Sequence, residues 1–150
     1  MHLREQWRLA AGDAILDQRI QQWADREGIE IDIESGTYRD PDGEWMGTVL
    51  GWNSGHAIHI RYDHSAPPEE INATALHELC HSVQVSHGQI DEGGRSTIEY
   101  EQGAWDLAKQ LAAQLGIAWT SHMDVIARQS VNTYIDAYNR RVKKNPIPRA

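Results

Sequence analysis

The chain has 150 residues, the length of one ordinary domain, and can bury a core without disulfide staples. Its composition, 40% hydrophobic and 24% charged, is that of a globular protein. The formal net charge of −8 argues against a broad phosphate-binding surface, so we expect no nucleic-acid partner. No stretch approaches the roughly 20 consecutive apolar residues of a membrane span, so we expect no membrane partner either.

Two further features bear on the cellular location. The single cysteine, Cys80, excludes a disulfide framework within the chain and fits a reducing compartment. The first residues include Arg4 and Glu5 and no uninterrupted apolar run, which is not typical of a signal peptide. These features predict a cytoplasmic protein, and they give no indication of its oligomeric state.

The first half of the chain predicts one helix followed by three short strands. Residues 13–27 carry apolar side chains at helical spacing, with Asp13 as the expected N-cap and Gly28 at the C-terminal end. The alternation of apolar and polar residues then predicts strands over residues 29–34, 44–51 and 57–62. Because the connections are short, we expect the strands to pair mainly antiparallel.

The second half predicts three helices. They are expected over residues 67–86, over residues 96–116, and from 121 to a point before Pro146. In the second of them, Ser96 and Glu99 match a capping box. Ser121 is the expected N-cap of the third.

The order of these elements is helix, three strands, three helices, which predicts a compact α+β fold. No linker long enough to divide the chain is visible. We therefore expect a single domain over residues 1–145, followed by a short, loose C-terminal tail over residues 146–150.

The residues that carry chemistry form the segment His77-Glu78-Leu79-Cys80-His81 in the first of these helices. His77 and His81 are four residues apart, so they project from one helix face, about 40° apart, and can bind one metal ion. Glu78 lies about 100° round from His77, beside such a metal. There it can take a proton from a water whose pKa zinc lowers toward about 7. The spacing predicts one zinc ion per chain, with Glu78 as the general base.

Zinc needs a third protein ligand, for which there are two candidates. Glu101 continues the apolar stripe of its helix, and an inward carboxylate is costly unless a cation meets it. Glu99 points to the polar side of the same helix. His87 has the spacing of the HExxHxxGxxH pattern, but Gln84 replaces the glycine that lets that chain turn. We therefore predict Glu101, with His87 as the alternative ligand and an ion pair between Glu101 and a buried arginine as the alternative to metal binding.

Other polar residues near the motif have no firm role. Cys80 is expected to be a buried thiol rather than a metal ligand. A hydrogen-bond donor to the transition state could come from any of six residues, which the sequence does not rank: His56, His59, His64, His122, Tyr62 and Tyr100.

These segments together resemble the gluzincin branch of the zincin metallopeptidases, and most of all the ImmA/IrrE-type family of bacteria and phages. The matching pieces are the strand AIHIR, the helix INATALHELCHSV and the segment EQGAWDLA, within residues 56–115. The resemblance implies a zincin-like fold with one zinc ion held by His77, His81 and Glu101, and Glu78 as the general base.

The predicted function is zinc-dependent hydrolysis of peptide bonds in protein or peptide substrates. The first alternative is a metal-binding regulatory module that holds a partner in the same cleft with little or no turnover. A metal that only stabilises the fold is a third interpretation, but such a site has no use for Glu78 as a base. The resemblance also implies an edge strand that pairs with an extended peptide, and we expect residues 57–62 to form it. Trp105 stands where the family often has Asn or Asp.

Overall fold

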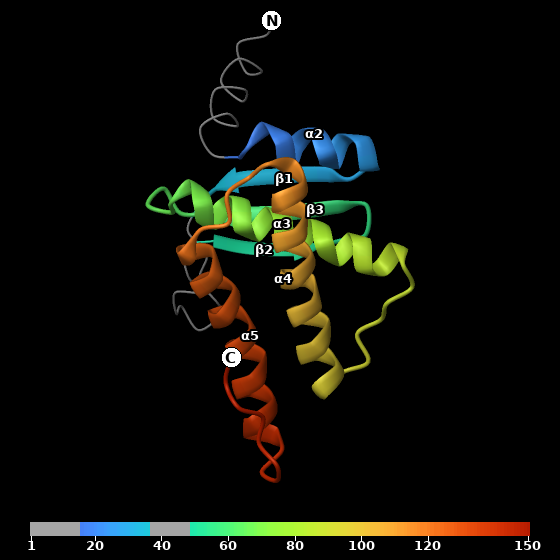
Figure 1. The fold of residues 1–150 in the computed structure, drawn as a ribbon, viewed down its shortest axis with the longest axis vertical. Coiled ribbons are helices and arrows are strands. Elements are labelled where there is room, and N and C mark those ends of the chain that lie inside the picture. The colour runs from blue at the N-terminus through green and yellow to red at the C-terminus, as the bar shows by residue number, and fades with distance from the viewer. Residues whose placement is uncertain (1–15, 37–48) are drawn as a thin grey trace, which may run out of the picture.

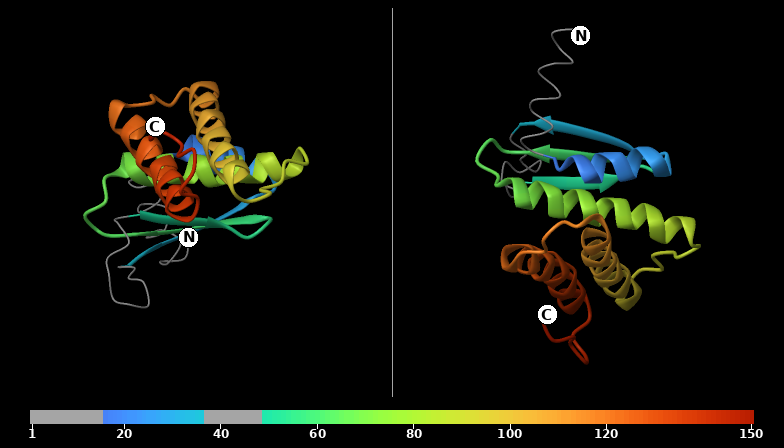
Figure 2. Two further views of the ribbon diagram at one scale, coloured as in Figure 1. Left: turned by 90° about the horizontal axis from the view of Figure 1, so that it is seen from below. Right: turned by 45° about the horizontal axis from the view of Figure 1, so that its top comes forward.

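The computed structural model describes residues 16–36 and 49–150. In chain order the described elements are α2 (Gln18–Glu27), β1 (Glu30–Ser35), β2 (Val49–Asn53), β3 (Ala57–Tyr62), α3 (Pro68–Ser86), α4 (Arg95–Leu115) and α5 (Ser121–Arg141). They form three layers: the sheet, then α2 and α3, then α4 and α5 (Figures 1 and 2). This arrangement confirms the predicted α+β class. None of the helices within the described ranges combines the length and the apolar character needed to cross a membrane.

The sheet has the strand order β1-β3-β2, so β3 is its central strand. β2 pairs antiparallel with β3, as expected. β1 pairs with β3 in parallel, which corrects the expectation of antiparallel pairing for this neighbour. The short-connection argument holds for consecutive strands, and β1 and β3 are separated in the sequence by β2.

The central place of β3 also corrects the prediction that residues 57–62 are an exposed sheet edge. β3 is paired on both sides, and its Ile58 and Ile60 are completely buried. β2 instead forms an edge, because its one described partner strand is β3. Residues 44–48 of the strand predicted before it lie outside the described residues.

Three helices begin at caps other than those predicted. α2 begins at Gln18 with Asp17 as its N-cap. The prediction that residues 16 and 17 belong to the helix is therefore wrong, and residues 13–15 lie outside the described residues. The carboxylate of Asp17 accepts a hydrogen bond from the backbone N–H of Arg19, in the first turn. α5 is capped by Thr120 rather than Ser121, and the Thr120 hydroxyl accepts from the backbone N–H of Met123 at 3.1 Å.

The predicted capping box of α4 is absent. The helix begins two residues earlier than the box requires, after Gly94, so Ser96 lies inside its first turn. The Ser96 hydroxyl accepts from the backbone N–H of Glu92, and the Thr97 hydroxyl donates to Asp91. These residues therefore hold the loop before α4 rather than cap the helix.

The last residues, 146–150, fold back along α5 and do not form the loose tail that was expected (Figure 1). The side chain of Asn139 bonds both the backbone N–H and the carbonyl of Ile147, at 2.9 and 2.8 Å. The backbone N–H of Ala150 donates to the Asn132 side chain at 2.7 Å. These hydrogen bonds give backbone groups of the returning segment partners on α5. The sequence pattern at the end of the helix does not indicate such contacts.

α3 is the middle of the molecule. One side packs against β2 and β3, and the other meets α4 and α5 (Figure 2). Its apolar residues Leu76 and Leu79 are completely buried. Several polar residues of the same helix are almost completely buried as well. Buried polar groups require hydrogen-bond partners or a counter-charge, and the partners on α3 define the candidate site.

Candidate metal centre

Three side chains from α3 and α4 meet in one buried cluster. Oε2 of Glu101 lies 2.9 Å from Nε2 of His77 and 3.2 Å from Nε2 of His81. The two histidines are one turn apart on α3, and Glu101 faces them from α4, which packs along α3. Each of the three residues is at most 8% exposed. The structure thus brings together the three residues predicted as zinc ligands.

The charges in this cluster are strongly coupled. Burial disfavours the Glu101 carboxylate, but the hydrogen bonds from His77 and His81 outweigh burial and hold the pKa of Glu101 at about 2. Burial likewise disfavours a charged His77, yet the carboxylates of Glu101 and Glu78 outweigh it and raise the pKa of His77. Glu101 is therefore ionised at neutral pH, as a metal-binding carboxylate must be.

The donor set and its spacing fit a zinc ion. Ligands bound to tetrahedral zinc at about 2.0–2.1 Å lie about 3.3 Å from one another. The separations of 2.9 and 3.2 Å between Glu101 and the two histidines are only slightly shorter. Ligand atoms of His77, Glu78 and His81 also lie within 4.8 Å of one another, so Glu78 offers a second carboxylate beside the two histidines. Two imidazole nitrogens and a carboxylate oxygen are donors that zinc prefers.

Gln84 orients His81 for such a role. Its side-chain NH₂ donates to the carbonyl of Tyr100 at 2.8 Å, so its oxygen faces Nδ1 of His81 at 2.9 Å. Because that oxygen can only accept, Nδ1 of His81 carries a proton, and Nε2 is the ring nitrogen that faces the Glu101 carboxylate. A proton or a metal ion between Nε2 and the carboxylate oxygen satisfies both atoms. α4 can approach Gln84 because a Cβ at Gly103 would lie 3.2 Å from its Nε2.

We predict that Gln84→Met, which keeps the side-chain length but removes both hydrogen bonds, weakens zinc binding by about 10–100-fold. Competition with a chromophoric chelator measures the affinity. Gln114→Met, at an exposed position of α4, is the matched control and should bind zinc as the native chain does. Equal affinities for the two variants would show that Gln84 has no part in holding His81.

Glu78 lies between the cluster and β2. Its Oε1 is 3.5 Å from Nδ1 of His77. β2 lies so close that a Cβ at Gly51 would be 3.0 Å from Cγ of Glu78 and 2.6 Å from Cγ2 of Thr74, which only glycine avoids. Asn53 then fixes the strand to the helix, because its side-chain NH₂ donates to the carbonyl of Glu78 at 3.3 Å. The end of β2 is thereby held beside the Glu78 carboxylate.

A cleft of about 350 Å³ opens at this point between β2, α3, α4 and Tyr134 of α5. Of the six donors considered from the sequence, Tyr100 lines it and stacks on His81, with ring centroids 5.0 Å apart. The other five are not among its lining residues: His56, His59, His64, His122 and Tyr62. His59 alternates with the buried isoleucines of β3, so it faces the opposite side of the sheet, where Asp32 lies 3.1 Å from it.

Tyr134 is a residue of the cleft that the sequence did not indicate. The pKa of Tyr134 is raised to about 12. Burial is the largest cause, and the charges of Glu101 and Glu78 and a hydrogen bond with Glu101 act in the same direction. The hydroxyl therefore keeps its proton at neutral pH and remains a donor. Tyr134 lies on the apolar face of α5, so packing alone explains why an aromatic residue stands there. No spacing in the sequence connects it to the motif on α3.

Two neighbours of the cluster are placed outside it. Cys80 is a free, buried cysteine, and burial raises the pKa of its thiol to about 12, so it stays a thiol, which confirms the expectation. His87 is exposed at the C-terminal end of α3, as its C-cap residue. Glu101, rather than His87, thus lies against the two histidines of the motif.

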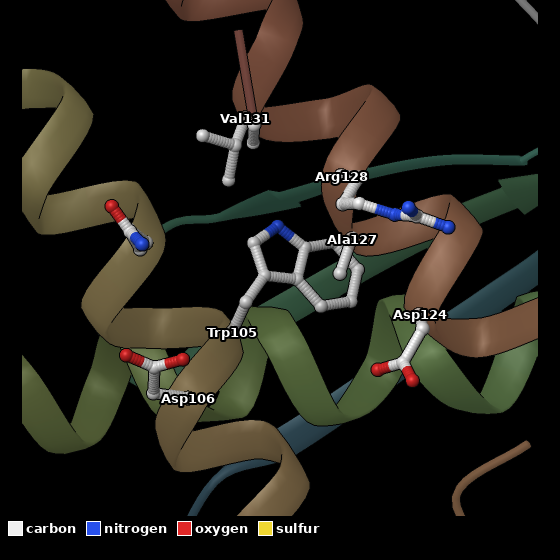
Figure 3. A pocket seen from close by; sticks show the side chains of 8 residues that line it. Trp105, Asp106, Asp124, Ala127, Arg128 and Val131 are labelled. Carbon is white, nitrogen blue, oxygen red and sulfur yellow. The ribbon is translucent and has the colours of Figure 1, made fainter. Parts of the chain in front are cut away.

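Trp105 supports the cluster from α4. Its ring stacks on His77 with centroids 4.1 Å apart and planes 6° from parallel, which fixes the imidazole plane. Within the described chain its indole N–H is buried without a hydrogen-bond partner. The ring lies between α4 and α5, beside Ala127 and Val131, at a pocket of about 430 Å³ (Figure 3).

The resemblance to the ImmA/IrrE-type family stays a prediction that rests on the motif residues. The convergence of those residues in space is a separate observation, independent of any relative. Compared with protein-family models, with curated proteins and with solved structures, the chain matches none.

Proposed function

We propose that the chain is a zinc-dependent peptidase that hydrolyses protein or peptide substrates. His77, His81 and Glu101 would hold the zinc ion, and Glu78 would act as the general base. The membership of a zincin family is part of this proposal. So is a cytoplasmic location, which suits the free thiol of Cys80.

The observation that carries the proposal is the meeting of two imidazoles with one ionised carboxylate inside the protein. His81, held by Gln84, points Nε2 at Glu101 across 3.2 Å, and His77 does so across 2.9 Å. A buried anion is costly without positive charge beside it. A divalent ion bound by all three removes that cost.

The remaining residues of the cleft suit peptide hydrolysis. When bound, zinc lowers the pKa of a water molecule and polarises a substrate carbonyl. Glu78 lies beside the ligand cluster and can accept a proton from the attacking water and pass it to the leaving amine. Tyr134 keeps its hydroxyl proton and can donate it in a hydrogen bond to the carbonyl oxygen as negative charge develops there.

The edge of β2 suits an extended peptide. No described strand pairs with the side of β2 that faces away from β3, and strand addition at that side is the binding mode we propose. Gly51 and Asn53 line the cleft together with Glu78. A peptide paired with this edge would run past the Glu78 carboxylate. β2 thus takes the role that the sequence assigned to residues 57–62.

Peptide cleavage tests the proposal. The 150-residue chain is assayed on a diverse peptide library by mass spectrometry in three states: zinc-loaded, chelator-treated, and reloaded with zinc. We expect cleavage in the first state, none in the second and recovery in the third. If peptides bind the zinc-loaded chain but are never cut, the result contradicts the peptidase and favours the regulatory module.

A further inference from the structure

Among the residues that the structure describes, few large apolar side chains are exposed to solvent, and some of these line the cleft. Among the described residues, the exposed large apolar side chains are Trp52, Val85, Ile90, Tyr134 and Val142. Val85 and Tyr134 line the same cleft as Glu78. Trp52 also borders it, but its ring stacks on His59, which faces the other side of the sheet. Exposed apolar groups that gather in a cleft mark a binding surface.

The two cleft residues come from different helices and stand beside the candidate metal centre. Val85 is one turn beyond His81 on α3, so it lies on the same helix face, and it is 61% exposed. Tyr134 reaches the cleft from α5 and is 37% exposed. Tyr100 of α4 lies with them, stacked on His81. We call Val85, Tyr100 and Tyr134 the apolar wall.

The charges of the cleft add a second restriction. Its described lining holds the carboxylates of Glu78 and Glu101 and no lysine or arginine. An acidic side chain of a peptide therefore meets no basic partner there, whereas an apolar side chain can cover the exposed surface of the apolar wall.

We propose that the apolar wall selects peptides with a large aliphatic or aromatic side chain next to the bond that is cut. This inference rests on the proposed peptidase function and names its substrate class. Val85 supplies aliphatic contact surface, and the rings of Tyr100 and Tyr134 supply flat surfaces on which an aromatic or branched side chain packs. When the peptide binds, apolar surface of both the apolar wall and the peptide side chain is buried, which favours binding.

Two peptides that differ in one residue test the selection. The peptide-library assay first identifies a sequence that the chain cleaves. Two versions of that peptide are then made, with Leu or Ser as the residue that flanks the cut. We expect the native chain to have a kcat/KM at least about 10-fold higher for the Leu peptide. Val85→Ser and Tyr134→Ser should each reduce this ratio to about 3-fold or less, whereas Tyr134→Phe, which keeps the ring, should retain the ratio.

Ile90→Ser is the matched control, because Ile90 is 73% exposed but does not line the cleft, and its ratio should equal that of the native chain. A second readout is binding of both peptides to zinc-loaded Glu78→Gln by fluorescence anisotropy, with and without Val85→Ser. The Leu peptide should bind more tightly, and Val85→Ser should remove the difference.

The outcomes separate this inference from the peptidase proposal. Zinc-dependent cleavage with no preference for Leu, or with a preference that both serine variants leave unchanged, overturns the apolar wall and leaves the peptidase standing. A zinc-loaded chain that neither cuts nor binds any peptide overturns the proposed function and this inference with it.

Discussion

Replacing Glu78 by Gln is expected to lower peptide hydrolysis by about 10²–10⁴-fold while about one zinc ion per chain remains bound. An amide of the same shape cannot accept the proton that the attacking water gives up. Zinc should stay because Glu101, and not Glu78, lies against Nε2 of both histidines. Turnover of the best library peptide and metal content by mass spectrometry measure the two effects.

Glu99→Gln is the control for this substitution, because it makes the same change at an exposed position two residues before Glu101. It should leave both turnover and zinc content at native values. Undiminished hydrolysis by Glu78→Gln would assign the base to another residue. Loss of zinc from Glu78→Gln would instead make Glu78 a ligand.

The second large effect concerns the third ligand. Glu101→Ala should purify largely without zinc, with an affinity reduced by far more than the roughly 10–100-fold of an indirect change. The variant should also unfold at lower urea concentration, since metal binding is linked to folding and the histidines lose their carboxylate partner. His87→Ala should keep its zinc, because His87 is exposed at the end of α3.

Zinc content and zinc affinity of these two variants are to be measured side by side. His87→Ala also serves as the control for the general effect of an alanine substitution, because His87 is exposed. An empty site in His87→Ala together with a filled one in Glu101→Ala would exclude the gluzincin ligand set and require a metzincin-like site.

The sequence predicted the fold where local patterns decide the outcome. Alternation of isoleucines located β3 at residues 57–62, and prolines located the start of α3. The same patterns could not order the strands, because pairing depends on contacts distant in the sequence. The parallel pairing of β1 with β3 and the edge position of β2 among the described strands are such long-range results. Caps were misplaced by one to four residues, since several neighbouring polar residues can bond the same backbone groups.

The candidate site divides in the same way. His77, Glu78 and His81 follow from helical spacing alone, and Glu101 follows from an acid on an apolar helix face. Gln84 was interpreted only as a missing glycine, although a buried glutamine three residues after a histidine can hold its ring. The tyrosine from α5 and the close contact at Gly51 depend on how separate elements pack, and no local pattern carries that information.

The central claim is that one zinc ion is bound by His77, His81 and Glu101. Crystals of the zinc-loaded chain, measured on both sides of the zinc absorption edge, test it most directly. We predict one strong anomalous peak per chain, about 2.0–2.2 Å from Nε2 of both histidines and from a carboxylate oxygen of Glu101. A peak coordinated by His87 in place of Glu101, or no zinc peak between α3 and α4, would contradict the account.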